Sequence, residues 1–338
     1  MSDVLMRGSD ASELGLKSPI LMAYEFDGAG GGRALADDEA GAALRDKRLA
    51  WVHLDMKAAD TKPWLEKEIS YLDPHIVNAL LADETRPRVT EIGDGALIIL
   101  RGVNLNKDAD PEDMVSIRLW VDNERIISLQ RRPLKAVGDM AERIVRGKGP
   151  ENAGSFISQL ILRLFERMEP VLLELDDMTD RVEEQILKEP DVSLRETIID
   201  IRQKAIIFRR YMAPQKDAIG HLRLCDFEWL DAKDKRHLQE SQDRVMRYVE
   251  DLDAIRERAQ IVKDELANMI ADRLNKNMYI LSVIAAIFLP LGFFTGLLGI
   301  NVGGIPGADN ADAFWIFCGL LVSIVALQVW LFKKLKWF

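Results

Sequence analysis

The residues that could bind a ligand are concentrated near the C-terminus. They carry side-chain amides or hydroxyls, or are glycines. Small residues recur there at intervals of three and four, in a stripe made of Ser282, Ala285, Leu289, Gly292, Gly296 and Gly299. The stripe extends back to Asn275 and forward to Asn301, so an amide stands at each end. Small residues let helices approach a common axis, and amide oxygens can replace part of a cation's water shell. The pattern predicts a pathway lined by Asn275, Ser282, Leu289, Gly292 and Gly296. A simple contact between two helices at Gly292 and Gly296 is the alternative.

The chemistry of this stripe predicts a divalent cation without identifying it. Neither of the two C-terminal apolar segments contains an acidic residue. Any filter must therefore consist of amides, hydroxyls and carbonyls. Such oxygen ligands suit a hydrated divalent ion better than a dehydrated Zn²⁺, which prefers imidazole and thiolate ligands.

A weaker candidate for metal chemistry is the pair His221 and Cys225, four residues apart and next to Asp226. At this spacing the two side chains can share one helix face, as in a zinc-binding pair. Two ligands do not complete the tetrahedral site that Zn²⁺ prefers, which favours a solvated histidine beside a buried thiol. The sequence contains no Gly-rich phosphate loop, nucleophile elbow or Cys-x-x-Cys pair. We therefore expect neither enzymatic activity nor a tightly bound cofactor.

The stripe belongs to the first of two apolar segments that can cross a membrane. Residues 278–300 and 313–332 carry no charge, and each is long enough for a hydrocarbon core of about 30 Å. Basic residues flank the outer ends of the pair, at 273 and 276 and again in the tail at 333–338, whereas the connecting segment 301–312 has none. The positive-inside rule therefore predicts a multi-pass membrane protein with both termini in the cytoplasm and residues 301–312 outside.

A long helix precedes the first span. Two interleaved sets of mostly apolar residues repeat every seven positions, Leu238, Val245, Leu252, Ala259 and Leu266, and Ser241, Tyr248, Ile255, Val262 and Met269. This heptad seam predicts a coiled-coil-like stalk over residues 231–277 and favours association between chains. A long helix that packs on its own domain is the alternative. Because two spans cannot enclose a pathway, transport would require an oligomer.

The first 230 residues have a different pattern. Short apolar runs predict strands at 20–26, 49–54, 97–103, 114–121 and 125–129, with short helices at 62–68 and 74–83. Residues 1–154 thus read as a mixed α/β cytoplasmic domain. Residues 155–230 read as a helical hairpin that turns at 190–193 and is interrupted at Pro190 and Pro214. The net charge of −10 disfavours a nucleic-acid partner.

Several motifs resemble those of the CorA superfamily of metal-ion transporters. Residues 296–301, Gly-Leu-Leu-Gly-Ile-Asn, are similar to its signature loop, which in most members ends Gly-Met-Asn. Isoleucine in the middle position resembles the zinc-transporter branch, ZntB. Residues 302–307, 84–89 and 209–215 are also similar to that branch, so the resemblance covers nearly the whole chain.

The resemblance implies a funnel-shaped homopentamer. Its α+β cytoplasmic domain is followed by a long stalk helix and two C-terminal transmembrane helices, with five copies of the first span around one pore. By position, Gly299, Ile300 and Asn301 would form the external selectivity loop, and Asn275, Leu289 and Gly292 would line the pore. A threonine often found in CorA channels falls at Gly292 here, which weakens the transfer of magnesium selectivity.

The hypothesis that follows is transport of Zn²⁺ across the bacterial inner membrane, with Co²⁺, Mg²⁺, Ni²⁺ and Cd²⁺ as further candidate ions. The expected partners are copies of the same chain, the lipid bilayer and divalent cations. A CorA-type magnesium or cobalt channel is the first alternative. The second is a membrane-tethered coiled-coil protein for signalling or scaffolding, which would not need a glycine-rich stripe that ends in amides.

Overall fold

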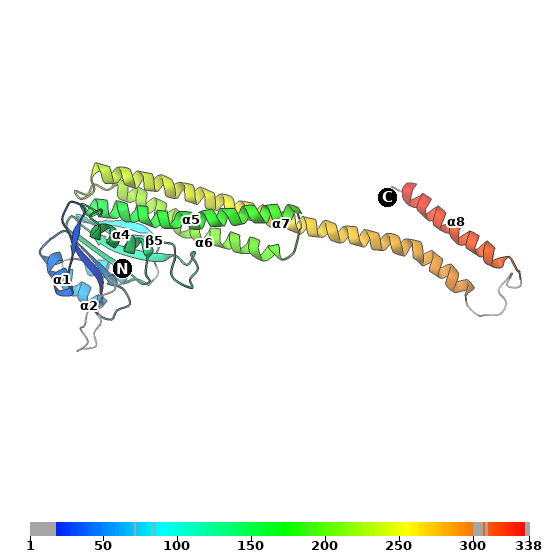
Figure 1. The fold of residues 1–338 in the computed structure, drawn as a ribbon, viewed down its shortest axis with the longest axis horizontal. Coiled ribbons are helices and arrows are strands. Elements are labelled where there is room, and N and C mark those ends of the chain that lie inside the picture. Colours follow the sequence, from blue (N-terminus) through cyan, green and yellow to red (C-terminus); the bar gives the residue numbers. More distant parts are fainter. Residues whose placement is uncertain are drawn as a thin grey trace. The chain divides into compact units, whose positions relative to one another are not determined.

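A computed structural model describes residues 18–70, 72–83, 85–188, 190–299, 307 and 310–334. The chain divides into two compact units, which are described separately (Figure 1). The N-terminal unit comprises Met1–Glu189 and Ser193–Lys263. The C-terminal unit comprises Pro190–Val192 and Asp264–Phe338.

A seven-stranded sheet forms the centre of the N-terminal unit. Its strands are β1 (Ile20–Phe26), β2 (Gly32–Ala34), β3 (Ala50–Asp55), β4 (Arg88–Ile92), β5 (Gly95–Gly102), β6 (Val115–Val121) and β7 (Arg125–Gln130). The order across the sheet is β2-β1-β3-β7-β6-β5-β4, and β3 and β7 are the parallel neighbours in it. The five predicted strands are confirmed. Strands β2 and β4, which lie at the two edges, were not predicted.

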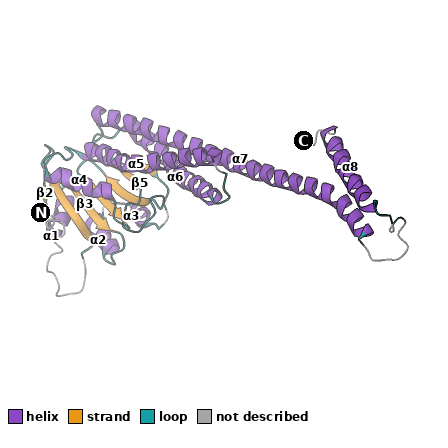
Figure 2. Ribbon diagram, turned by 45° about the vertical axis from the view of Figure 1, so that its right-hand side comes forward, coloured by secondary structure: helices purple, strands orange, loops and turns teal. Residues whose placement is uncertain are grey.

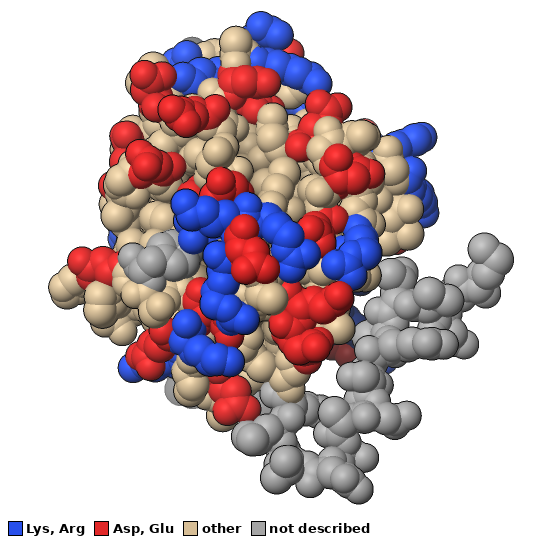
Figure 3. Space-filling model, turned by 90° about the vertical axis from the view of Figure 1, so that its left-hand side faces the viewer, with Lys and Arg blue, Asp and Glu red and all other residues tan. Residues whose placement is uncertain are grey.

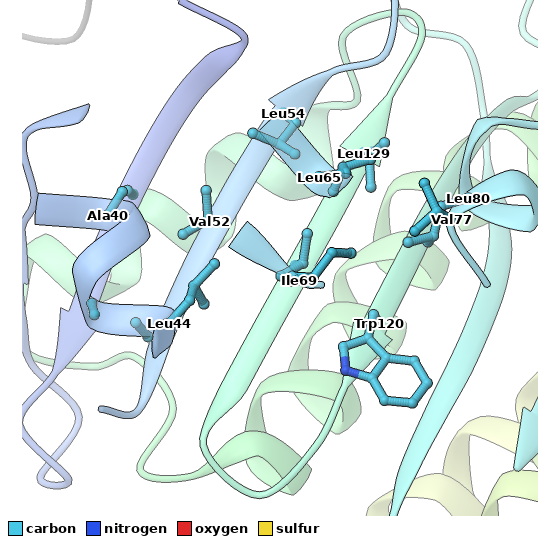
Figure 4. Packing of buried hydrophobic residues seen from close by; sticks show 14 of the residues in the cluster. Ala40, Leu44, Val52, Leu54, Leu65, Ile69, Val77, Leu80, Trp120 and Leu129 are labelled. Atoms are coloured by element: carbon cyan, nitrogen blue, oxygen red, sulfur yellow. The ribbon is translucent and has the colours of Figure 1, made fainter. Parts of the chain in front are cut away.

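One face of the sheet is covered by three short helices, α1 (Asp37–Arg45), α2 (Thr61–Glu68) and α3 (Pro74–Leu81). Leu44, Leu65 and Leu80 from these helices belong to one buried cluster with Val52 and Leu54 of β3, and all five side chains are fully buried (Figure 4). Alternate residues of a strand point to opposite faces, so Trp51 and His53 must be covered from the other side.

The opposite face carries α4 (Lys135–Val145) and the start of α5 (Ala153–Lys188) (Figure 2). The ring of Phe156 on α5 lies 4.9 Å from that of Trp51, centroid to centroid. Ser128 Oγ accepts a hydrogen bond from Trp51 Nε1 and lies 2.7 Å from His53 Nδ1. Burial lowers the pKa of His53 to about 4, so this imidazole is neutral. Because both faces of the sheet are covered, β5 reads as a nearly continuous apolar run, and even the polar residues Ser116 and Arg118 of β6 are buried.

Three long helices complete this unit, and the last of them continues into the C-terminal unit. Helix α5 is followed by α6 (Leu194–Leu224) and α7 (Ala232–Leu298), with the predicted turn at 190–193 between α5 and α6. The prediction that Pro214 interrupts the hairpin is wrong, because α6 runs through it. Buried side chains on either side of the proline, Met212 and Gln215 among them, hold this helix in place despite the lost backbone hydrogen bond.

The heptad seam of α7 packs within a single chain. Leu238, Val245, Leu252, Ile255 and Ala259 are each at most 2% exposed in the isolated chain. Tyr248 meets Phe165 of α5 edge-on, with centroids 6.1 Å apart, and Arg258 Nη1 lies 2.9 Å from Asp176 of α5. From α6, Arg209 Nε donates to Asp253 at 2.6 Å. The interpretation of residues 238–262 as a self-associating seam is therefore wrong, since a three-helix packing already buries them.

Charges of both signs are distributed over the outer face of the N-terminal unit shown in Figure 3. Lysine and arginine side chains alternate there with aspartate and glutamate, so the net charge of −10 does not make that face uniformly negative. Any electrostatic attraction of cations must arise from local acidic clusters.

The C-terminal unit contains the last part of α7 and helix α8 (Ala313–Lys334). Both helices contain a segment long and apolar enough to cross a membrane, and the apolar windows are 6% and 0% buried. An α+β domain followed by a long helix and a second apolar helix is thus confirmed as the fold class. The homopentamer stays a prediction.

Candidate functional site

The predicted stripe lies uncovered along the last turns of α7. Asn275, Ser282, Leu289, Gly292 and Gly296 are all exposed, and Leu289 is 77% exposed. A Cβ atom added at Gly292 or Gly296 would meet no atom within 4 Å. In a single chain, therefore, nothing fills the space in front of these small residues.

Two hydroxyls on this segment present oxygen acceptors. Ser282 Oγ donates its proton to Met278 O at 2.8 Å, and Thr295 Oγ1 donates to Leu291 O at 2.8 Å. A hydroxyl has one proton and two lone pairs, so a hydroxyl that donates to the backbone turns acceptors outward. Oxygen lone pairs attract cations. The stripe pattern includes Ser282 but misses Thr295, which lies one residue before Gly296.

Helix α8 borders one side of α7 within this unit. Gln328 Nε2 donates to Ala286 O at 2.9 Å, and a groove of about 980 Å³ opens between the helices. Phe288, Leu291, Gly292 and Thr295 line it from α7, whereas Ser282, Leu289 and Gly296 do not. Gly292 thus belongs to the stripe and also lines the groove that faces α8, where the space in front of it is open.

The predicted selectivity loop begins where the described part of α7 ends. Gly299 N–H donates to Thr295 O at 2.9 Å, which closes the last turn after Leu298. Ile300 and Asn301 lie outside the described residues. Their proposed role therefore rests on the sequence.

The weaker candidate pair gains a third member in the structure. His221 Nε2 lies 3.0 Å from Glu91 Oε1, and Cys225 Sγ donates to His221 O at 3.3 Å. One ligand atom from each of Glu91, His221 and Cys225 lies within 4.8 Å of the other two. The sequence offered no sign of Glu91, because its strand β4 was not predicted. Asp226, the residue adjacent to the pair, points to solvent and pairs with Lys235 at 3.7 Å.

The thiol of this cluster is unsuited to nucleophilic catalysis. Burial, together with the neighbouring Glu91 carboxylate, raises the pKa of Cys225 to about 12. Near neutral pH the metal-free side chain is a protonated thiol, whereas nucleophilic attack needs a thiolate.

The architecture and sequence match one family over nearly the whole chain. The family model described as CorA-like Mg²⁺ transporter protein matches residues 46–334. The divalent cation transporter CmaX of Pseudomonas aeruginosa is 37% identical over 330 residues, 97% of this chain and 99% of the relative. The zinc transport protein ZntB of Yersinia enterocolitica is 35% identical over 321 residues, 95% of this chain and 96% of the relative.

A solved structure supports the same assignment. The full-length CmaX protein has a TM-score of 0.82 at 37% identity, covering 94% of this chain and 98% of that one. The predicted resemblance to metal-ion transporters, including the zinc branch, is confirmed. This chain belongs to the CorA-like family of Mg²⁺ transporter proteins.

Proposed function

We propose that this chain transports divalent cations, with Zn²⁺ as the principal ion, across the bacterial inner membrane through a homopentameric pore. The observation that carries the proposal is the uncovered stripe on α7, which joins small residues to outward-facing oxygen acceptors. Family membership supports metal-ion transport, and two relatives are named for divalent cation and zinc transport. In this account the divalent ion is cargo, and the chain performs no catalysis.

An oligomer is needed because two helices cannot surround an ion. The stripe has open space in front of it in a single chain, and large apolar side chains on both α7 and α8 are exposed. Lipid can cover the apolar side chains, but a polar pathway must be enclosed by protein. Five copies of α7 around one axis would turn Asn275, Ser282, Leu289 and Gly296 inward, with Gly292 at the edge of the α8 contact.

The choice of Zn²⁺ rests on relatives and on one position. Zinc transport proteins match 95% of the chain, and Ile300 replaces the methionine common in the signature. Oxygen acceptors along α7 would bind a cation that keeps part of its water shell. Mg²⁺ and Co²⁺ can pass in this form as well as Zn²⁺. A magnesium or cobalt channel is therefore the second candidate, and the CmaX relative is named only for divalent cations.

The membrane orientation follows from charge. Lys333 and Lys334 end α8, and Lys334 Nζ lies 5.0 Å from the ring centroid of Trp330, a pairing typical of the membrane interface. With Arg273 and Lys276 before the first span, both termini belong on the cytoplasmic side. Gly299, Ile300 and Asn301 would then form the outer entrance.

Metal uptake into liposomes tests the proposal. Full-length protein should admit Zn²⁺ faster than Co²⁺ and Mg²⁺, whereas protein-free liposomes should admit none of the three. Gly296→Leu should block the flux by filling the stripe. Gly319→Leu on α8 is the matched control, because a Cβ at either glycine meets no atom within 4 Å. Absence of flux from folded wild-type protein would favour the signalling or scaffold alternative.

A further inference from the structure

Glu91, His221 and Cys225 come from two elements that are far apart in sequence and are brought together by the fold. Glu91 lies on β4, the edge strand of the sheet, and His221 lies in the last turn of α6. Cys225 is the C-cap of α6, where the backbone turns out of the helix and its N–H donates to His221 O at 3.2 Å. An ion held by all three would therefore fasten the end of α6 to the sheet edge.

The geometry of the three ligand atoms fits a small tetrahedral cation. In a zinc site with bonds of about 2.0–2.3 Å, neighbouring ligand atoms stand roughly 3.4 Å apart. His221 Nε2 and Glu91 Oε1 are already 3.0 Å apart, and no pair in the cluster exceeds 4.8 Å. The spacing that a zinc site requires lies between these two values. Glu91 and His221 are 48% and 50% exposed, so water can enter and take the fourth position.

The donor set selects among metals. Thiolate and imidazole are the ligands that Zn²⁺ prefers, whereas Mg²⁺ takes oxygen ligands in an octahedral arrangement. Coordination would displace the proton of Cys225, because a metal-bound thiol is deprotonated. The ion must therefore be one that binds sulfur strongly, which Mg²⁺ does not.

An acidic hollow adjoins the cluster and supports its role as a cation site. A pocket of about 510 Å³ is lined by Glu91 together with Asp94, Asp122, Glu124, Asp226 and Glu228, against Lys47 and Arg125. Carboxylates outnumber basic groups there, so the hollow concentrates cations at the side from which Glu91 is reached. Glu91 itself belongs to both the pocket and the cluster.

We propose that Glu91, His221 and Cys225 bind one Zn²⁺ in the N-terminal unit, with water as the fourth ligand, at a site separate from the transport pathway. The bound ion joins α6 to β4. With three protein ligands, the fourth coordination position stays open to water. This inference is independent of the pore, because it concerns residues that are all in the N-terminal unit.

Cobalt spectroscopy on the full-length protein in detergent tests the site. Co²⁺ replaces Zn²⁺ in such sites, and a cobalt–thiolate bond gives a charge-transfer band in the near ultraviolet. The chain has two cysteines, Cys225 and Cys318. Wild-type protein and Cys318→Ser should show the band, and Cys225→Ser should not. Zn²⁺ should abolish the band stoichiometrically, whereas excess Mg²⁺ should leave it.

Two further variants keep the test decisive if Cys225→Ser does not fold. Glu91→Gln and His221→Gln alter half-exposed side chains, so both should fold. Each should raise the cobalt concentration at half-saturation by at least about tenfold, since even the loss of an outer-shell partner weakens metal sites by about 10–100-fold. Gly296→Leu should block transport and keep the band. The proposal is overturned if wild type shows no band, if the band follows Cys318, or if Glu91→Gln and His221→Gln bind cobalt as wild type does.

Discussion

The side-chain amide of Gln215 makes both of its hydrogen bonds to the backbone of Arg101. Its Oε1 accepts from Arg101 N–H at 2.7 Å, and its Nε2 donates to Arg101 O at 3.1 Å. Strand β4 pairs with β5 only as far as Ile99, so the β5 edge has no strand beside it at Arg101. Gln215 takes the place of that strand, while the Arg101 guanidinium lies 4.1 Å from the ring centroid of Tyr211. The motif at residues 209–215 thus docks α6 onto the sheet.

Replacing Gln215 with leucine should destabilise the N-terminal unit. The change leaves two buried backbone groups of Arg101 without partners, at a cost of about 2–4 kcal/mol. The apparent unfolding temperature in detergent should fall clearly. Gln203→Leu is the matched control, since Gln203 is exposed on the same helix and its loss should change little. Equal stability of the two variants would show that the double hydrogen bond is unimportant.

Leu252→Ala should weaken the fold of each chain rather than the assembly. Leu252 is fully buried in a single chain, and truncating such a side chain costs about 2–5 kcal/mol. Thermal unfolding should therefore occur at lower temperature, with the oligomer mass unchanged in native mass spectrometry below that temperature. A variant that dissociates without losing stability would instead support the hypothesis that the seam joins neighbouring chains.

Ile206→Asp should weaken the assembly rather than the fold of each chain. Ile199 and Ile206 are large apolar side chains seven residues apart on α6, and they are 47% and 41% exposed. A charge at an exposed position is tolerated by the single chain, but burying it between chains is unfavourable. We expect the proportion of the proposed pentamer to fall while the secondary structure is kept. Unchanged assembly would mean that this α6 surface faces solvent in the oligomer.

Stability should depend on pH through Asp234. Burial raises the pKa of this carboxyl to about 6, and the nearby Asp231 carboxylate adds to the shift. Because the folded pKa lies above the unfolded value of about 3.9, its ionisation opposes folding, and stability is lost as pH rises from about 4 to 6. Asp234→Asn should therefore be more stable than wild type by about 1–2 kcal/mol at neutral pH. This figure allows for the loss of the favourable interaction between the carboxylate and the N-terminus of α7.

Unfolding temperatures of wild type and Asp234→Asn across this pH range check the prediction. In wild type, Ser158 Oγ lies 3.4 Å from Asp234 Oδ1. The side-chain oxygen of asparagine can take the place of that Oδ1 atom in the variant. The advantage of the variant should shrink below about pH 5 as wild type becomes protonated. A variant that is less stable at every pH would show that the charge of Asp234 stabilises the fold.

The sequence was most informative where one physical requirement dominates. Two uncharged runs of membrane-crossing length predicted the apolar segments of α7 and α8, and apolar runs predicted the strands covered on both faces. Helix α1 was missed because Gly41 lowers helix propensity. The glycine is needed there, since a Cβ would come within 2.7 Å of the Glu68 carboxylate, which also pairs with Arg45.

The candidate sites show what a linear pattern does not contain. A heptad seam indicates that one helix face is apolar. The same pattern is compatible with packing against a partner chain and with packing against the chain's own α5 and α6. The long-range docking of Gln215 on Arg101 brings α6 alongside β5, and only then does His221 reach Glu91. Because β4 is a short edge strand in which most residues are polar and exposed, Glu91 gave no signal of its own.

Zinc flux through Asn301→Ala tests the central claim most directly. Five Asn301 amides at the outer entrance are proposed to hydrogen-bond the water shell of an arriving ion. The variant should keep the oligomer mass and the unfolding temperature of wild type but lose selective Zn²⁺ uptake into liposomes relative to Co²⁺ and Mg²⁺. Asn301→Asp should instead bind the ion tightly and slow its release. Wild-type zinc flux and selectivity in Asn301→Ala would contradict the proposed filter and, with it, the pathway along α7.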